Sequence, residues 1–424
     1  MVHGKHNKYE ETSMKEVNKR RNKSLEDFNP KEFVETRIKQ IQNVIRKEKV
    51  LVAVSGGVDS TVSAVLTYRA IGNQLTCVTL DDAFMRRNEP EKVAELLSNS
   101  PINLPVKIIE ARERFLKALK GLKDAEEKRR AFRKTFYETL SELARKEGCS
   151  FLVQGTNRAD VVETKSGIKT QHNVLEQIGI SPIERFGFKI VEPVVQLYKS
   201  QVREVAKYLG IPDEIIERQP FPGPGLAVRV VGEVRVDKLE TLRVTTALVE
   251  KRLAEFKPSQ HFAVIIDNEQ IRDYGRLIRI QEATARFLNV PSRHVHAKIF
   301  VDKATGVKRG VRRYGYVVGI RVQTPDEKVH QPPILNLIAL QKKILTDNPS
   351  FTRVWYAIRY LTSEKPYVIG IRAVETRDFL EAEVSKLPWN TLNKTAEEIL
   401  EKYNNVSEIY YDVTPKPPAT IEME

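Results

Sequence analysis

The chain has little of what marks secreted, disulfide-bonded or membrane-spanning proteins. Its 424 residues include two cysteines, Cys77 and Cys149, and each lies in an apolar segment, so they cannot build a disulfide framework. No apolar run is long enough to span a bilayer, and the opening residues lack the apolar stretch of a signal peptide. We therefore expect a cytoplasmic protein with no membrane contact, whose cysteines are small core residues.

Acidic residues are fewer than basic ones. The chain holds 70 Lys and Arg against 56 Asp and Glu, which gives a net charge of +14. This excess favours anionic partners such as nucleotides, RNA or an acidic protein, but it does not choose among them. Hydrophobic residues make up 41% of the chain, and its length exceeds what one core usually covers, so we expect two domains.

Strands alternate with helices in the first half of the chain. Residues 1–29 are polar, with a basic cluster, and we predict a loosely docked tail. After it, hydrophobic periodicity predicts helices at 33–45, 61–71, 89–97 and 124–147, and strands at 50–54, 75–80, 106–109 and 150–153. This alternation is typical of a doubly wound parallel sheet, which we place in a domain spanning residues 30–228.

The second half of the chain contains an internal repeat. The string YVVGIR at 316–321 recurs as YVIGIR at 367–372. Each copy leads to a predicted helix and then to a further strand, at 352–358 and 407–413. We infer a duplicated strand–helix–strand unit, and therefore an α+β domain over residues 229–424 with two related subdomains. The proline- and glycine-rich PFPGPG at 220–225 is a domain boundary or a functional loop, because it fits neither a helix nor a central strand.

The string SGGVDS, Ser55 to Ser60, lies between a predicted buried strand and a helix. Gly56 and Gly57 let the backbone approach an anion without a Cβ clash, and N–H groups at the start of a helix point at such an anion. Asp59 is unexpected beside phosphates unless it holds Mg²⁺ or orders the loop. No lysine follows the glycines, so this is not a Walker A loop. The sequence predicts a phosphate-binding loop of another kind.

SGGVDS resembles the pyrophosphate loop of the N-type ATP pyrophosphatases. Further motifs resemble the ATP-pyrophosphatase part of the GMP synthase family, and they follow the order of that family. They are NEPEKV (88–93), RFLKALKG (114–121), EEKRR (126–130), TFYE (135–138), QGT (154–156), DVVET (160–164), IKTQHNV (168–174), PFPGPGLAVRVVGEV (220–234) and KPPATIE (416–422). The resemblance implies an adenine nucleotide alpha hydrolase-like fold, followed by a dimerisation-type domain.

The resemblance also implies a reaction. In this family the 2-oxygen of xanthosine monophosphate (XMP) attacks the α-phosphate of ATP, pyrophosphate leaves, and ammonia then displaces AMP to give GMP. ATP and Mg²⁺ are therefore expected to be required, and XMP is the expected substrate. No segment has room for a glutaminase domain, so a separate glutamine amidotransferase subunit is expected to supply ammonia. A homodimer is also implied, and nucleic acid is not expected as a partner.

The matching motifs imply roles for individual residues. The residues assigned to ATP are Ser55, Gly56, Gly57, Val58, Asp59, Ser60, Thr61 and Gly155. Those assigned to catalysis are Asp160, Glu163, Lys169 and His172, and those assigned to Mg²⁺ are Asp59, Asp160 and Glu163. Those assigned to XMP are Arg129, Asn173, Pro222, Gly223, Gly225, Lys416, Thr420 and Glu422. Lys169, His172 and Asn173 match a mobile lid.

The chain departs from the family pattern at several positions, which keeps two other hypotheses open. Ala83, Arg133, Gln171, Leu175, Glu176, Gly310 and Met423 stand where the family has other residues. The altered lid and the positive charge motivate a related enzyme that adenylates an RNA base or another nucleotide for thiolation or amidation. Thiolation usually needs a reactive cysteine, and the apolar surroundings of both cysteines disfavour it. A non-catalytic paralogue is the third hypothesis, which the intact SGGVDS and KPPATIE disfavour.

Overall fold

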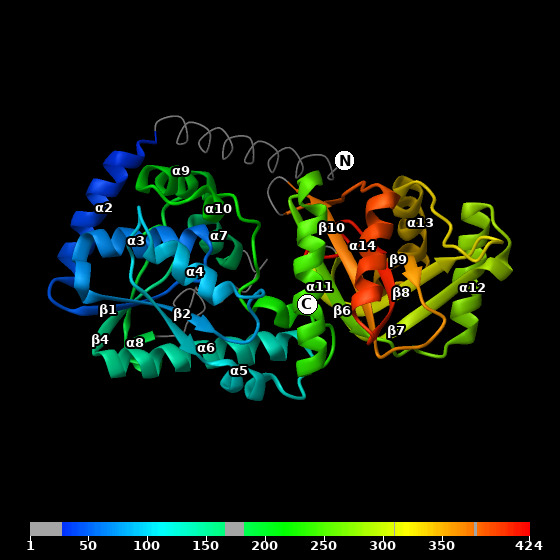
Figure 1. The fold of residues 1–424 in the computed structure, drawn as a ribbon, viewed down its shortest axis with the longest axis horizontal. Coiled ribbons are helices and arrows are strands. Elements are labelled where there is room, and N and C mark those ends of the chain that lie inside the picture. The colour runs from blue at the N-terminus through cyan, green and yellow to red at the C-terminus, as the bar shows by residue number, and fades with distance from the viewer. Residues whose placement is uncertain (1–27, 166–181, 309, 377–379) are drawn as a thin grey trace, which may run out of the picture. The chain divides into compact units, whose positions relative to one another are not determined.

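The computed structural model describes residues 28–165, 182–308, 310–376 and 380–424 (Figure 1). The chain divides into two compact units, and each unit is assembled from separate segments. The first contains residues 1–80, 91–109 and 140–218, and the second contains residues 81–90, 110–139 and 219–424. The domain limits expected from the sequence, 1–29, 30–228 and 229–424, stay predictions. Among the described residues, no helix is both long and apolar enough to cross a membrane.

The first sheet has five strands in the order β3-β2-β1-β4-β5 (Figure 1). The strands are β1 (Lys49–Ala53), β2 (Leu75–Asp81), β3 (Val106–Glu110), β4 (Cys149–Val153) and β5 (Lys189–Val191). β1 is parallel to both β2 and β4, and β4 is parallel to β5. Val50, Leu51 and Val52 are fully buried, as a continuous apolar run in a central parallel strand requires. The predicted doubly wound sheet is confirmed.

Helices connect these strands along the chain. They are α2 (Pro30–Ile45), α3 (Val58–Ile71), α4 (Glu89–Ser98), α5 (Arg112–Leu119), α6 (Ala125–Glu147), α7 (Arg158–Lys165), α8 (Pro182–Phe186), α9 (Lys199–Leu209) and α10 (Asp213–Ile216). α2, α3 and α9 pack against one another. The helices predicted at 33–45, 61–71, 89–97 and 124–147 are α2, α3, α4 and α6, and are confirmed.

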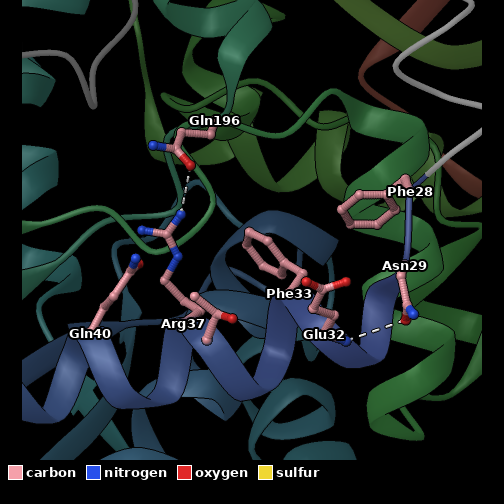
Figure 2. A pocket seen from close by; sticks show the side chains of 8 residues that line it. Phe28, Asn29, Glu32, Phe33, Arg37, Gln40 and Gln196 are labelled. Atoms are coloured by element: carbon pink, nitrogen blue, oxygen red, sulfur yellow. Dashed lines mark hydrogen bonds between the residues drawn. The ribbon is translucent and has the colours of Figure 1, made fainter.

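α2 begins with a strong local signal. The Asn29 side chain accepts the N–H groups of Lys31 and Glu32, at 3.0 and 3.3 Å, and Pro30 occupies the first helical position. A hollow of about 320 Å³ lies beside this helix, and Figure 2 shows side chains that line it. It is lined by Phe28, Asn29, Glu32, Phe33, Thr36, Arg37, Gln40 and Gln196. Residues predicted to bind ATP or XMP are absent from this lining.

The second sheet is built from two copies of one unit, and one copy is inserted into the other. Its strands follow the order β11-β10-β12-β9-β8-β7, and β6 pairs with β10. The elements are α11 (Val236–Leu253), β6 (Gln260–Asp267), α12 (Tyr274–Leu288), β7 (Val295–Lys308), β8 (Val311–Val322), α13 (Ile334–Asp347), β9 (Phe351–Tyr360), β10 (Tyr367–Glu375), β11 (Glu383–Val384), α14 (Trp389–Lys402) and β12 (Val406–Asp412).

The inserted copy is α12-β7-β8-α13-β9, and the host copy is α11-β6, then β10-α14-β12. In each copy the first two strands are antiparallel, and a helix then leads to a third strand parallel to the second. The copies join where β9 and β12 pair in antiparallel fashion. The duplication predicted from YVVGIR and YVIGIR is therefore present. The sequence did not indicate that one copy is nested in the other.

The repeated glycines explain why the two strings are alike. Trp355 is paired in register with Gly319, and Tyr410 with Gly370. Each ring instead covers the glycine of the other copy: a Cβ on Gly370 would lie 2.6 Å from the Trp355 ring, and one on Gly319 would lie 3.0 Å from the Tyr410 ring. Trp355 and Tyr410 themselves pack together, with ring centroids 6.1 Å apart. The glycines therefore leave room for aromatic packing across the joint.

We expect Gly370→Ala to destabilise the protein by about 1–3 kcal/mol, because the added methyl overpacks against a buried indole. Thermal or denaturant unfolding of the purified variant measures this change. Gly275→Ala is the control, since Gly275 is exposed and an added Cβ would come no closer than 3.7 Å to a neighbour. An unfolding midpoint of Gly370→Ala equal to that of the control would contradict this packing.

Candidate active site

The predicted phosphate loop joins β1 to α3 at the middle of the first sheet. β1 has β2 on one side and β4 on the other, so the order of the strands reverses here. In open α/β sheets, ligands bind beyond the carboxyl ends of the strands at such a reversal. Ser55–Thr61 follows β1, and Gly155 follows β4. The fold therefore brings these two predicted ATP-binding segments to one edge of the sheet.

The loop backbone is shaped by its glycines. Gly56 has a positive φ of 72°, and an added Cβ there would lie 2.5 Å from Val93 and 2.6 Å from the Arg218 guanidinium. Gly57 is the N-cap residue of α3, and it has no side chain to cap the first amides of the helix. The Ser60 hydroxyl donates to the Gly57 carbonyl oxygen at 3.0 Å. The N–H groups at the start of α3 thus have the arrangement that anion binding needs.

Gly155 packs directly against the phosphate loop. An added Cβ would lie 2.6 Å from the Ser60 nitrogen and 2.8 Å from the Asp59 carbonyl carbon. Both neighbours are main-chain atoms, which cannot move aside as a flexible side chain can. The role of Gly155 that follows from this geometry is to leave space for the loop.

Asp59 lies in the first turn of α3, and Lys199, at the start of α9, forms an ion pair with it. One Asp59 oxygen, Oδ2, accepts from the Lys199 ammonium. The other, Oδ1, is buried and has no hydrogen-bond partner in the described part of the chain. A buried carboxylate oxygen without a partner costs free energy unless a ligand or cation completes it. Asp59 therefore fits a cation-binding role, and Lys199 is a candidate phosphate contact that the sequence motifs did not indicate.

The acidic pair and the lid are only partly described. Asp160 lies in the first turn of α7, where its Oδ2 accepts the Asn157 N–H at 3.1 Å. Glu163 is on the same helix, but its side chain lies outside the described residues, as do Lys169, His172 and Asn173. Within the described ranges, no group of three or more His, Cys, Asp or Glu side chains could hold a metal ion. The Mg²⁺ set of Asp59, Asp160 and Glu163 stays a prediction.

Apart from Asn173, which lies outside the described residues, the predicted XMP residues belong to the second unit, and there Arg129 lies in a cluster of charged groups. Glu126, one turn earlier on α6, accepts from Arg312 at 2.6 Å and from Tyr314 at 2.8 Å. Burial lowers the pKa of the Arg129 guanidinium, and the like charge of Arg312 lowers it further. Arg129 Nε is buried without a hydrogen-bond partner among the described residues. Two guanidinium groups this close favour an anion with more than one charge.

The C-terminal segment lies against this cluster. Glu422 accepts from Arg229 through both carboxylate oxygens, each at 2.9 Å. Arg229 is fully buried, and its guanidinium stacks over the Phe262 ring at 3.8 Å. Arg129 donates to the backbone oxygen of Glu424, whose side chain pairs with buried Lys128. These contacts hold Glu422 and its neighbours against α6, although the two segments lie far apart in the sequence.

The remaining predicted XMP residues lie in two segments of the second unit. Pro222 and Gly223 come just before a short 3-10 helix, Gly225–Val228, and Gly225 is its first residue. Gly225 has a φ of +58°, and a Cβ on it would lie 2.3 Å from the Phe84 carbonyl oxygen. Lys416 pairs through its backbone with Ala382, at 2.9 and 2.8 Å. The Thr420 hydroxyl accepts from Arg353 at 3.0 Å.

Two departures from the family pattern have a structural description. Ala83 keeps a left-handed backbone, with φ of 70°, where the family has glycine. Its carbonyl accepts from Arg243, and its N–H donates to Asp81 at 3.2 Å, which holds this conformation in place. Gly310 lies in the turn between β7 and β8, with φ of 77°, and a Cβ added to it would meet no described atom within 4 Å. Arg312, two positions later, is the positively charged residue that pairs with Glu126 beside Arg129.

Comparison with known proteins agrees with this arrangement. Residues 30–212 match the family model of the PP-loop domain, and residues 362–423 match that of the GMP synthase C terminal domain. The chain is 43% identical over 397 residues to the B subunit of the glutamine-hydrolyzing GMP synthase of Sulfurisphaera tokodaii, an alignment that covers 94% of this chain and 100% of that relative. The corresponding B subunits of Saccharolobus solfataricus and Methanopyrus kandleri are 43% and 38% identical over the same shares. The chain belongs to the family of GMP synthase B subunits.

Proposed function

We propose that this chain is the ATP-pyrophosphatase subunit of a two-subunit GMP synthase. It binds ATP and XMP, joins AMP to the 2-oxygen of XMP with release of pyrophosphate, and lets ammonia displace AMP to give GMP. A separate glutamine amidotransferase subunit supplies the ammonia. One observation carries this proposal. The loop Ser55–Thr61 packs closely against Gly155, at the point where the strand order of the first sheet reverses.

The phosphate loop acts on the leaving pyrophosphate. Negative charge builds up on the phosphoryl oxygens as the bond between the α- and β-phosphates breaks. The first amides of α3, with the hydroxyl of Ser55, donate hydrogen bonds to these oxygens without having to reorganise. The Ser60 hydroxyl donates to the Gly57 carbonyl and so helps to hold the loop. Lys199 adds a positive charge beside Asp59. These groups lower the barrier because they act most strongly on the charge of the transition state.

Mg²⁺ fits this site through Asp59 Oδ1, which has no hydrogen-bond partner in the described ranges, and Asp160 and Glu163 are its further predicted ligands. When bound, the ion neutralises phosphate charge. Lys169 and His172, in the predicted lid, are proposed to act on the α-phosphate, and Asn173 on XMP.

The second unit supplies the XMP groups. Arg129 and Arg312 are proposed to bind the phosphate of XMP, since they place two guanidinium groups together and leave Arg129 Nε without a partner in the described chain. Glu422 is held by its ion pair with Arg229, and its carboxylate is proposed to act on XMP together with Thr420 and Lys416. Pro222, Gly223 and Gly225 complete the nucleotide-binding surface. The homodimer and the cytoplasmic location stay predictions.

Incubating the purified chain with ATP, Mg²⁺, ammonium and XMP is expected to yield GMP, AMP and pyrophosphate in equal amounts. Chromatography of the nucleotides and a coupled pyrophosphate assay measure them. Pyrophosphate formed without XMP but stimulated by RNA would favour adenylation of an RNA base instead. No ATP cleavage with any of these substrates would favour a non-catalytic subunit.

Gly155→Ala is expected to lower ATP cleavage by at least about 100-fold, because its methyl would push the Asp59–Ser60 backbone out of the position that binds phosphate. Steady-state pyrophosphate release measures the loss, and Gly275→Ala is again the control. Full activity of Gly155→Ala would mean that the loop is not held against Gly155 in the working enzyme.

Asp59→Asn is expected to lower turnover by about 100-fold or more, because the amide keeps the shape of the side chain but removes its negative charge. A titration of Mg²⁺ should show a higher half-saturating concentration, and the melting temperature should change by only a few degrees. Asp213→Asn, at an exposed position on α10, is the matched control. Unchanged turnover and Mg²⁺ dependence would remove Asp59 from the metal and phosphate site.

A further inference from the structure

The segment that follows β12 forms no regular strand, and scattered backbone hydrogen bonds and buried side chains hold it together. We call residues 413–424 the tail. Two backbone hydrogen bonds join it to the β7–β8 hairpin, from Val307 N–H to Pro418 at 2.6 Å and from Thr305 N–H to Met423 at 2.7 Å. Four of its carbonyl oxygens, at 414, 420, 421 and 422, accept from just two arginines. The tail conformation therefore depends on those two side chains.

Arg353, on β9, reaches the tail with one edge of its guanidinium. Its Nη2 donates to the Thr420 carbonyl at 2.9 Å, to the Thr420 hydroxyl at 3.0 Å, and to the Glu422 carbonyl. Its Nη1 donates to Asp412 at 2.7 Å. The side chain is fully buried, and desolvation lowers its pKa to about 10, so it remains charged at neutral pH.

Arg372 lies on β10, on the other side of β12 from β9, and it contacts the same segment. It donates to the carbonyls of Thr414, Thr420 at 3.0 Å and Ile421 at 3.4 Å. It also lies 3.3 Å from the Asp412 oxygen that Arg353 contacts. Arg372 is fully buried, and Asp412 is 1% exposed. We call Arg353, Arg372 and Asp412 the clamp.

The clamp has more positive than negative charge, and it therefore needs acceptors from the tail. Two buried cations share one buried carboxylate, so the second positive charge has to be met by carbonyl oxygens. The carbonyls of the tail provide these acceptors. If the tail left, both guanidinium groups would keep buried N–H donors without partners, which is costly. The clamp and the tail conformation therefore stabilise each other.

The clamp forms at one of two related positions. In the aligned strings TRVWYAI and SEIYYDV, Arg353 corresponds to Glu408, and Ala357 corresponds to Asp412. Glu408 instead pairs with Lys298 and accepts from Tyr410. Arg353 and Asp412 thus have no counterpart of their own type in the other half of the duplication, whereas Arg372 corresponds to Arg321. The inserted copy supplies Arg353, and the host copy supplies Arg372, Asp412 and the tail.

We propose that Arg353 and Arg372 are positioning residues for XMP recognition, which they achieve by fixing the tail backbone around Lys416, Thr420 and Glu422. This inference rests on the proposed function, because it assigns XMP to the tail. Neither arginine has to touch the substrate. Loss of the clamp should weaken XMP binding and leave ATP binding intact, since the phosphate loop belongs to the other unit.

The test compares Arg353→Lys and Arg372→Lys with Arg359→Lys. Lysine keeps the charge, but it cannot donate in the planar fork that spans several acceptors. Arg359 lies on the same strand as Arg353, is exposed, and pairs with Glu397, so it is a matched control. We expect each clamp variant to raise the KM for XMP by at least about 10-fold, with the KM for ATP within about 2-fold of the unmodified protein. An unchanged KM for XMP in a folded clamp variant would overturn the proposal.

A second measurement covers variants that fold poorly. Hydrogen exchange of tail amides, measured by mass spectrometry without substrates, should be faster in clamp variants than in Arg359→Lys. Equal exchange would overturn the positioning role. If the unmodified chain makes no GMP, the proposed function fails, whereas faster exchange would still support the clamp.

Discussion

Main-chain amides can hold a polyphosphate only where no side chain stands in front of them and none already occupies them. The loop after β1 meets both conditions, because Gly57 cannot cap α3 and Gly155 leaves room for the turn. Much of the first unit supports this arrangement. The reversal of strand order places the loop beside the end of β4, and Lys199 and Arg218 approach it from later segments.

The second unit solves a different problem, which is to hold an irregular segment in one conformation. A strand would be held by a regular ladder of backbone hydrogen bonds, whereas the tail combines scattered backbone hydrogen bonds with bonds from buried guanidinium groups. Arginine suits this role because its five donors spread over several carbonyl oxygens in one plane. The same residue type recurs at Arg229, which fixes the Glu422 carboxylate. Burying these charges is tolerable because carboxylates and carbonyl oxygens accept from most of the guanidinium nitrogens, although Arg353 Nε and Arg229 Nη1 are buried without a partner among the described residues.

The nested duplication gives the protein a sheet of two related halves with unequal functions. The aromatic packing is the same in both halves, because Trp355 and Tyr410 each lie over the glycine of the opposite copy. The polar positions differ between the halves, since Arg353 and Asp412 have no equivalents in the other half. The aromatic packing between the two copies is therefore symmetric, whereas the charged groups that hold the tail are not. A domain of this kind can change one half chemically while the other maintains the sheet.

Local patterns in the sequence determined much of this protein. The apolar run at 50–54, the glycines of SGGVDS and the YVVGIR repeat predicted the parallel sheet, the phosphate loop and the duplication, because each signal lies within a few residues. Helix α9, which carries Lys199, was not among the predicted helices. Its signals were the apolar spacing of Val202, Val205 and Leu209 and a left-handed glycine at its end.

The tertiary structure alone decided which distant residues meet. Asp59 and Lys199, Glu126 and Arg312, and Arg353 and Thr420 come together because particular strands are neighbours, and strand order is not written in any local pattern. The nesting of one copy within the other has the same cause, since hydrophobic periodicity fixes the type of an element but not its partner. The sequence thus determined the elements and the loop chemistry, and long-range packing decided the charged contacts around them.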